Sequence, residues 1–332
     1  RDALLWARCI DQALTMFGDK ADCLINCHNW PVWGRAELCR YLEEQRDIYK
    51  YIHDQTLRLA NTGLTPNEIA AQIEEPDWLS GTFHSRGYYG TLSFNVRAVY
   101  QRYYGFFDGN PVNLDPLPPE AMGQRIVAAV GGPDAAIEIA AQAIEDDDLQ
   151  WAATLLSHLV FSGSPPEDAA PMLALVYRHM GFRAESGIMR NIYLTGAGEL
   201  ERGITPLPMA GGRNADLAAT LPVRDWFDAF ALRLNPDRAR GVSLTLNFTI
   251  DGQELGLSVA RQTEFARPGT LHEKAEANIS ISLALLEQLA AGEMSAAEVE
   301  AAGAVIEGDA GIVQRWLDLH DKFDMWFNIV TP

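Results

Sequence analysis

One short stretch near the beginning of the chain has a residue type and a setting that suit metal chemistry. It runs from Asn26 to Gly34 (NCHNWPVWG) and follows the apolar run Cys23-Leu24-Ile25, which is typical of the end of a buried strand. A histidine that leaves the carboxyl end of a strand in an α/β layer points into the crevice where ligands bind. His28 is therefore a candidate metal ligand, although a lone histidine beside a tryptophan is more often a packed, hydrogen-bonded side chain.

The other histidines do not complete a metal site by their spacing. The chain has seven histidines, and no two of them are spaced like a pair of metal ligands: His28, His53, His84, His158, His179, His272 and His320. The sequence spacing therefore indicates one candidate metal ligand but not the several ligands that a metal site requires.

Further runs along the chain carry a recognisable pattern. They are Gln45 to Asn61 (QRDIYKYIHDQTLRLAN), Arg86 to Thr91 (RGYYGT), Phe107 to Pro111 (FDGNP), Ala184 to Ser186 (AES), Arg190 to Ala197 (RNIYLTGA) and Trp326 to Pro332 (WFNIVTP). Together with the stretch around His28, these runs resemble the alkyl sulfatases of the metallo-β-lactamase superfamily, which hydrolyse dodecyl sulfate-like detergents. The resemblance covers nearly the whole chain.

The resemblance implies a metal-dependent sulfuric ester hydrolase with two zinc ions in each complete site. The implied substrate is an alkyl sulfate or another alkyl-chain small molecule, and the implied assembly is a homodimer. Members of the family build most of the zinc site from an upstream His-x-His-x-Asp-His segment, which does not occur in these 332 residues. We therefore expect the carboxyl-terminal portion of a longer protein, or a chain that receives the remaining metal ligands from a separate chain. The compartment is left open, with a periplasmic or secreted location slightly favoured.

An aromatic-rich connector at residues 76–118 is the second candidate site. The resemblance implies that its Gly-Tyr-Tyr-Gly segment borders the sulfate site, with a histidine usually in place of Phe94 and another in place of Asn29. A sulfate ester needs hydrogen-bond donors in a site that excludes water, and phenylalanine supplies none. A different substrate, a compensating residue and weakened activity all remain open, as does a purely structural aromatic connector. The candidate substrate-binding residues are Tyr88, Tyr89, Phe94, Asn95 and Phe106.

Composition excludes some classes of function. The formal net charge of −19 and the absence of a basic stripe argue against nucleic-acid binding. No apolar run approaches the roughly 20 residues that a membrane-spanning helix needs. The four cysteines, Cys9, Cys23, Cys27 and Cys39, form no Cys-x-x-Cys pair, which favours reduced buried thiols over disulfides or a cysteine zinc site.

The predicted fold has an α/β part, an all-α part and an α+β part in that order. Residues 1–75 are predicted to hold helices over 2–17 and 35–62 on either side of a strand, which the resemblance identifies as the end of a metallo-β-lactamase αββα layer. Thr65-Pro66-Asn67-Glu68 predicts a capping box that starts the next helix. A short helix over Val96–Tyr104 is expected in the connector. Residues 119–205 are predicted to be all helical, and the resemblance implies that they carry the dimer contact.

The last region, residues 216–332, is predicted to be an α+β domain with helices against one face of a sheet. Apolar residues alternate from Val242 to Ile250 and from Leu255 to Val259 around the turn Asp251-Gly252, which predicts a hairpin. Helices are expected over 223–234, over 283–291 and from Asp309 to Lys322, and strands at 279–281 and 305–306. The pattern resembles the sterol carrier protein type 2 domain, whose interior holds fatty chains. The candidate alkyl-chain tunnel residues are Phe248, Trp316, Phe323 and Trp326, for each of which an ordinary core role is the alternative.

Two hypotheses from different classes follow. The first is the carboxyl-terminal portion of a dinuclear zinc alkyl sulfatase, with His28 as a metal ligand and no catalytic residue assigned within the chain. The second is a noncatalytic dimeric carrier of lipids or alkyl chains derived from that family. The retained His28 favours the first, and Phe94 together with the missing ligand segment favours the second.

Overall fold

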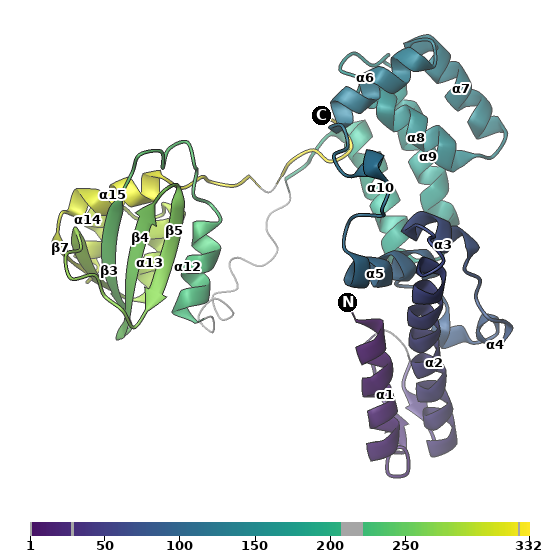
Figure 1. The fold of residues 1–332 in the computed structure, drawn as a ribbon, viewed down its shortest axis with the longest axis horizontal. Coiled ribbons are helices and arrows are strands. Elements are labelled where there is room, and N and C mark those ends of the chain that lie inside the picture. Colours follow the sequence, from purple (N-terminus) through teal and green to yellow (C-terminus); the bar gives the residue numbers. More distant parts are fainter. Residues whose placement is uncertain (1, 28–29, 207–221, 325) are drawn as a thin grey trace. The chain divides into compact units, whose positions relative to one another are not determined.

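The computed structural model describes residues 2–27, 30–206, 222–324 and 326–332, which fall into two compact units (Figure 1). The first unit comprises Arg1–Ile204 together with Asn328–Pro332, and the second comprises Thr205–Phe327. The boundaries predicted at 75/76 and 118/119 lie inside the first unit. The predicted linker at 205–214 lies largely outside the described residues.

The first unit begins with two helices that pack along each other. Helix α1 (Ala3–Phe17) ends at Gly18, as predicted, and α2 (Arg35–Ala60) is the long predicted helix. Between them, β1 (Cys23–Leu24) pairs antiparallel with β2 (Val32–Trp33). The prediction of a buried strand here is wrong, because β1 is half-buried and Ile25 is 77% exposed. Within the described part of the chain, β1 packs against β2 and α2, and this is too little to bury it.

Three further helices follow α2, and the first and third of them pack against it. The capping box at Thr65 and Glu68 is confirmed at the start of α3 (Pro66–Gln72), and the short α4 (Asp77–Ser80) follows. After the 3-10 turn η1 (Phe83–Ser85), α5 (Leu92–Tyr104) begins four residues earlier than predicted, because the Thr91 hydroxyl caps it by accepting the Phe94 N–H. Buried His53 of α2 lies 2.8 Å from the Tyr103 hydroxyl of α5, which ties the two helices together. A second 3-10 turn, η2 (Pro111–Asn113), leads into the helical region.

The predicted all-helical region is confirmed. It consists of α6 (Pro119–Ala129), α7 (Pro133–Glu145), α8 (Leu149–Val160), α9 (Ala169–Arg183) and α10 (Gly187–Arg202). Alanine and leucine side chains of neighbouring helices form its core, and Asp148 caps α8 by accepting the Trp151 N–H. Within the described ranges, no single helix is both long enough and apolar enough to cross a membrane. Helices α6 and α7 taken together meet both criteria, but they are bent by 86° relative to each other.

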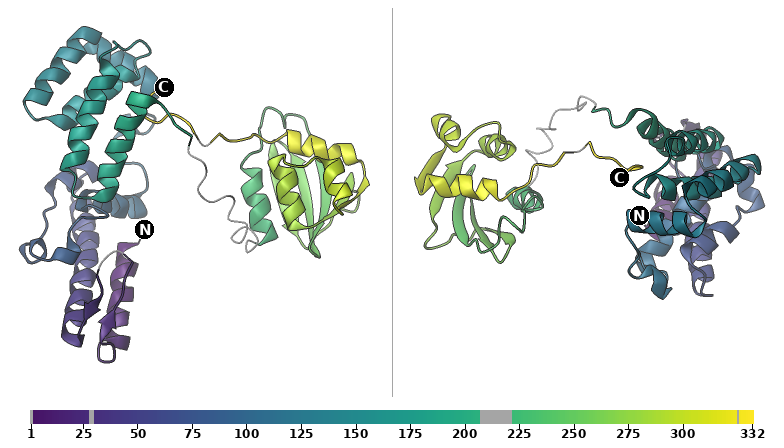
Figure 2. Two further views of the ribbon diagram at one scale, coloured as in Figure 1. Left: turned by 180° about the vertical axis from the view of Figure 1, so that it is seen from behind. Right: turned by 90° about the horizontal axis from the view of Figure 1, so that it is seen from above.

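The second unit is a five-stranded sheet with helices on one face (Figure 2). Its strand order is β5-β4-β3-β6-β7, where β3 and β6 run parallel and all other neighbours antiparallel. The strands are β3 (Leu244–Ile250), β4 (Gln253–Ala260), β5 (Thr263–Pro268), β6 (Ala277–Ile281) and β7 (Val305–Gly308). The helices are α12 (Val223–Ala231), α13 (Leu283–Ala291), α14 (Ala296–Ala301) and α15 (Ala310–Asp318).

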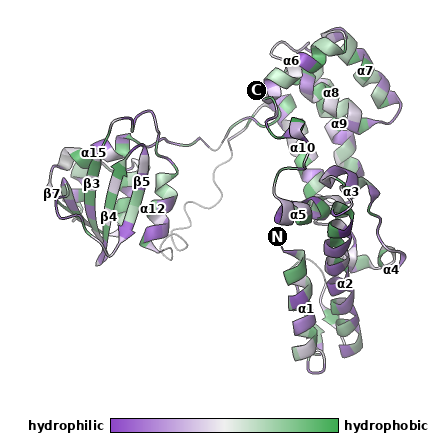
Figure 3. Cartoon of the chain, in the orientation of Figure 1, coloured by the Kyte–Doolittle hydropathy of each residue, from purple (hydrophilic) through white to green (hydrophobic). Residues whose placement is uncertain are grey.

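The hairpin between β3 and β4 confirms the sequence prediction, and the alternation along its strands determines which side chains enter the core. Asp251 and Gly252 both have positive φ, as a tight turn between twisted strands requires. Hydrophobic and hydrophilic residues alternate along these strands (Figure 3), so every second side chain of β3 is buried under the helices. Gly292 closes α13 in a left-handed conformation, again as predicted.

Four elements were not predicted from the sequence, namely β2 and α4 of the first unit and β5 and α14 of the second, and two predicted helices of the second unit are shorter than expected. The edge strand β5 buries Ala266 as its core position and is otherwise polar or exposed, so its sequence lacks the alternation that reveals β3. The short α14 was also missed. Helix α12 ends at Ala231 and α15 at Asp318, whereas the sequence predicted ends near 234 and 322.

Candidate functional site

His28 and Asn29 lie outside the described residues, so the structure leaves the predicted metal ligand as a prediction. The residues around them are described: β1 before them pairs with β2 after them. Among the residues that the structure describes, no group of three or more His, Cys, Asp or Glu side chains could hold a metal ion. The described residues therefore do not by themselves fit a two-zinc site.

The Tyr88-Tyr89 segment is fixed to the start of α10. The Gly187 N–H donates to the Tyr88 carbonyl over 2.8 Å, and the Ser186 hydroxyl donates to the Tyr89 carbonyl over 2.7 Å. Ser186 is only 1% exposed and also caps α10 by accepting the Met189 N–H. Two motifs that lie about 100 residues apart in the sequence are thus joined through two hydrogen bonds, one of them from the buried Ser186.

Charge and ring contacts reinforce this junction. Arg86 forms an ion pair with Glu185, and its guanidinium carbon lies 5.5 Å from the centre of the Tyr88 ring. The Phe83 and Tyr88 rings are 5.2 Å apart. Both tyrosine side chains remain exposed, so the segment presents aromatic faces from a backbone that is held in place. We name the group Arg86, Tyr88, Tyr89, Glu185 and Ser186 the tyrosine junction.

The other three predicted substrate-binding residues lie at opposite ends of α5. Phe94 and Asn95 are half-buried in the first turn of α5, where a Cβ at Gly90 would lie 3.2 Å from the Asn95 amide oxygen. Phe106 follows the far end of α5 and is 80% exposed. A rise of 1.5 Å per residue places the two ends of this helix about 18 Å apart. The structure therefore brings Phe94 and Asn95 to the tyrosine segment, and it places Phe106 at the opposite end of the helix.

Sequence reasoning missed a histidine–carboxylate pair beside the tyrosine junction. His84 Nε2 lies 2.8 Å from Glu44 Oε2, and the Tyr41 ring packs 4.2 Å from the imidazole. Gln45 donates to both the His84 carbonyl and the Ser85 hydroxyl over 3.0 Å. The spacing of Tyr41, Glu44 and Gln45 on one face of α2 was the available signal, but their partners are about 40 residues away in the sequence.

The same network reaches the stretch that contains His28. The Asn26 amide donates to the Tyr41 hydroxyl over 3.2 Å. Contacts therefore run from Asn26 through Tyr41 to His84, and the neighbouring Phe83 packs against Tyr88 of the tyrosine junction. Burial lowers the pKa of His84 below its ordinary value, although the Glu44 carboxylate opposes the shift.

We expect His84 to make the stability of the chain fall as the pH drops below about 6.5, the ordinary pKa of histidine. Because the folded state holds the pKa of His84 below that of the unfolded state, the unfolded state binds the extra proton first, and the free energy of unfolding decreases. Urea unfolding at a series of pH values should show a shallower decrease for His84→Gln. The exposed His179→Gln should keep the wild-type dependence, and identical curves for wild type and His84→Gln would contradict the assignment.

Of the four candidate alkyl-chain residues, two lie in the core of the second unit and two lie outside it. Phe248 and Trp316 are fully buried with ring centroids 5.6 Å apart, and the Phe227 and Phe230 rings pack against Trp316. Phe323 is 61% exposed, and Trp326 is partly buried outside this core. The structure thus joins two of these four residues in one aromatic core and leaves the other two outside it.

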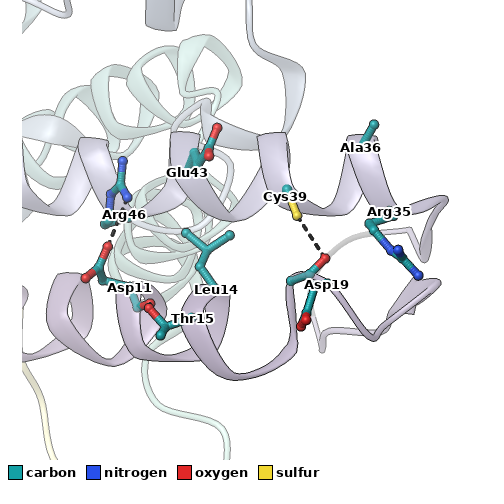
Figure 4. Close-up of a pocket in the computed structure, with 10 residues that line it drawn as sticks. Asp11, Leu14, Thr15, Asp19, Arg35, Ala36, Cys39, Glu43 and Arg46 are labelled. Atoms are coloured by element: carbon teal, nitrogen blue, oxygen red, sulfur yellow. Dashed lines mark hydrogen bonds and ion pairs between the residues drawn. The ribbon is translucent and has the colours of Figure 1, made fainter.

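A groove between α1 and α2 has a volume of about 680 Å³ (Figure 4). Its polar groups are largely engaged with one another: Arg46 pairs with Asp11 over 3.0 Å, and the Cys39 thiol donates to the Gly18 carbonyl over 3.3 Å. The four cysteines are free thiols in the described structure, as predicted. The expectation that they are buried is wrong, because α1 and β1 are covered on one side and leave Cys9 and Cys27 exposed.

Comparison with known proteins assigns both units. The family domain described as alkyl sulfatase dimerisation matches residues 65–203, and the domain described as alkyl sulfatase C-terminal matches residues 212–332. The chain is 39% identical over 336 residues to an (R)-specific secondary-alkylsulfatase of Pseudomonas sp., covering 100% of the chain and 50% of that protein. It is 37% identical over 334 residues to the alkyl/aryl-sulfatase BDS1 of Saccharomyces cerevisiae, covering 100% of the chain and 51% of that protein.

A solved structure agrees with these relatives. The stereoselective inverting sec-alkylsulfatase Pisa1 from Pseudomonas sp. matches with a TM-score of 0.93 and 38% identity, covering 100% of the chain and 53% of that protein. The chain spans about half the length of the curated relatives it matches.

Proposed function

This chain belongs to the alkyl sulfatase family through its dimerisation and C-terminal domains, and we propose that it forms the carboxyl-terminal portion of a dinuclear zinc alkyl sulfatase. The complete enzyme would hydrolyse alkyl sulfate esters to an alcohol and sulfate. The observation that carries the proposal is the tyrosine junction, in which hydrogen bonds from Ser186 and Gly187 hold the backbone that presents Tyr88 and Tyr89. Such rigid support is what a substrate-positioning wall requires.

Several large apolar side chains are exposed at the start of the chain, and we propose that another segment covers them. Leu5, Trp6 and Phe17 of α1 are each more than half exposed, and so are Trp33 of β2 and Trp30 just before it. Several large apolar side chains left exposed in one region are typical of an interaction surface. We propose that the half of the family's length not represented here covers this surface, either on the same chain or on a separate one, and brings most of the zinc ligands. In this proposal His28 supplies one ligand.

The second unit would hold the alkyl chain of the substrate. Each buried methylene contributes about 0.8 kcal/mol, so a long chain gains several kcal/mol from an apolar site. That gain can offset the repulsion between an anionic ester and a chain with a net charge of −19. The aromatic core around Phe248 and Trp316 supports this assignment to the domain.

The helical domain would form a homodimer. Its helices α7 to α10 expose large apolar side chains that a second copy could cover: Ile139, Trp151, Leu175, Phe182 and Ile192. Apolar residues of this kind are enriched in the buried centre of dimer interfaces.

A noncatalytic carrier of lipids or alkyl chains is the second candidate. Phe94 favours it, because its ring cannot donate a hydrogen bond to a sulfate oxygen. The amino-acid sequence of the complete protein discriminates between the two. A His-x-His-x-Asp-His segment supports the hydrolase, and an unrelated sequence supports the carrier.

Replacing His28 by alanine in the complete protein should lower the zinc content from two ions per chain to one or fewer. Loss of an outer partner of a zinc ligand already costs roughly 10–100-fold in affinity, so loss of a ligand itself should cost more. Elemental analysis after dialysis measures the stoichiometry, and His179→Ala, an exposed site on α9, serves as the control. Two retained zinc ions with undiminished hydrolysis would contradict the role of His28.

A further inference from the structure

The first unit includes a short segment from the end of the sequence, Asn328–Pro332, which we name the return segment. The chain leaves the first unit at Ile204, forms the whole second unit, and enters the first unit again at Asn328. The second unit is therefore connected to the first at both of its ends. Neither the proposed hydrolysis nor the proposed dimer gives the return segment a role.

A carboxylate of α10 holds the backbone of the return segment. Glu199 Oε1 accepts the Ile329 N–H over 2.7 Å and the Val330 N–H over 2.9 Å. These lengths are typical of charge-assisted hydrogen bonds, which are roughly twice as strong as bonds between neutral groups. The return segment, all of whose residues are described, belongs to no helix or strand. Its N–H groups therefore depend on acceptors from elsewhere in the unit.

A glycine on the same face of α10 makes room for one side chain of the return segment. Gly196 lies three residues before Glu199, which places both on one face of the helix. A Cβ at Gly196 would lie 3.3 Å from the Tyr177 ring of α9 and 3.4 Å from Val330 Cγ1. Val330 is half-buried, whereas the neighbouring Ile329 is 70% exposed. The site thus binds the backbone of two residues and contacts the side chain of one.

The length of chain at each end limits how far the second unit can move from the first. Asp321 is fixed to the second unit, because its N–H donates to the Arg233 carbonyl and its carbonyl accepts from Arg233 Nε, both over 2.7 Å. Residues 322–327 can span at most about 25 Å from there to Asn328, at roughly 3.6 Å per extended residue. Residues 205–222, the other connection, can span about 68 Å at the same spacing. The shorter connection therefore sets the limit only while the return segment stays bound.

We infer that α9 and α10 form a binding site for an extended peptide and that its occupant is the chain's own return segment. Glu199 binds the peptide backbone, and the space beside Gly196 takes the Val330 side chain. Occupancy of this site restricts the range of the second unit, and release of the return segment extends that range. The inference is independent of the proposed hydrolysis, because it concerns only how the two units are connected.

Hydrogen exchange of the complete 332-residue chain tests the site directly. Mass spectrometry follows the Ile329 and Val330 amides, and we expect both to exchange at least tenfold faster in Glu199→Ala than in the wild type. Glu201 lies on the same helix but forms ion pairs with arginines of α9 and α10, so Glu201→Ala should leave the exchange of both amides unchanged. Wild-type exchange in Glu199→Ala overturns the inference.

Substitutions within the return segment test the side-chain contact. Val330→Ala should speed exchange of the Ile329 amide severalfold, whereas Ile329→Ala, at an exposed position, should leave the Val330 amide close to the wild type. Both positions lie outside the helices and strands, so both variants keep the fold of each unit. Equal effects of the two substitutions overturn the inference. Exchange that becomes faster as the wild-type chain is diluted also overturns it, because a second copy would then supply the segment.

Small-angle X-ray scattering tests the consequence for the second unit. A chain without residues 328–332 serves as the released reference, and Glu199→Ala should resemble it. We expect the maximum dimension to grow by about 10 Å in both, since the reach of a flexible chain increases with the square root of its length. A maximum dimension that stays at the wild-type value in either variant overturns the inference. None of these measurements involves hydrolysis, so their outcome leaves the hydrolase proposal unaffected.

Discussion

Replacing Ser186 by alanine should lower hydrolysis by the complete protein by roughly tenfold to hundredfold. The Ser186 hydroxyl holds the Tyr89 carbonyl over 2.7 Å and caps α10, and both bonds disappear in the variant. A displacement of about 1 Å in a positioning element can cost about 100-fold in rate. The lost buried bond and the lost cap should also cost about 1–3 kcal/mol of stability. Steady-state hydrolysis of decyl sulfate and urea unfolding measure the two effects.

The control for this prediction is a cap of the same kind in the second unit. Ser282 caps α13 by accepting the Leu285 N–H and belongs to the second unit, whereas the tyrosine junction belongs to the first. Ser282→Ala should therefore lower the free energy of unfolding by about 1 kcal/mol while the rate of hydrolysis stays near that of the wild type. Equal rates for the two variants would show that fixing the tyrosine segment does not contribute to turnover.

Replacing Trp316 by alanine should destabilise the second unit by about 3–5 kcal/mol. The side chain is fully buried among four aromatic partners, so the substitution removes a large apolar surface and leaves a cavity. It also removes the N–H that Glu264 Oε2 accepts, which leaves a buried carboxylate with fewer partners. For a domain of about 100 residues, a loss of this size lowers the Tm by at least roughly 12 °C.

Calorimetry of the complete chain measures this effect, with Phe323→Ala as the comparison. Phe323 is 61% exposed, so its truncation should change stability by less than about 0.5 kcal/mol. Because each unit has its own hydrophobic core, the transition of the first unit should stay in place in both variants. An equally large loss with Phe323→Ala would mean that its side chain is buried in solution.

The local elements of the fold could be predicted because their causes are local. The capping box at Thr65, the stop at Gly292 and the Asp251-Gly252 turn each depend on residues within a few positions of one another. The turn between β4 and β5 follows the same rule but was missed. Arg261 and Gln262 adopt positive φ without the Asn-Gly or Asp-Gly pair that usually signals it.

The candidate site could be predicted only in outline. The resemblance pointed to Tyr88 and Tyr89, and the structure holds both in one supported segment. It did not separate Phe94 from Phe106, because the length of α5 depends on the Thr91 cap and that cap was not recognised. The resemblance also did not distinguish the buried Phe248 and Trp316 from the exposed Phe323. An apolar residue type favours burial, but it does not show which residues surround the side chain.

By itself, the sequence determined the order of helical and sheet regions, the family resemblance and the candidate ligand His28. Helical and strand periodicity reflect local backbone geometry, and a resemblance between sequence runs can be recognised without knowing the fold. The tertiary structure alone decided the pairings of His84 with Glu44, of Ser186 with Tyr89 and of His320 with Glu264. Each pair joins groups that lie about 40 to 100 residues apart in the sequence, and in the second pair the partner is the Tyr89 backbone carbonyl. Burying a charged or hydroxyl group is unfavourable unless tertiary packing supplies a hydrogen-bond partner for it. The periodicity of the sequence does not show which distant residue that partner is.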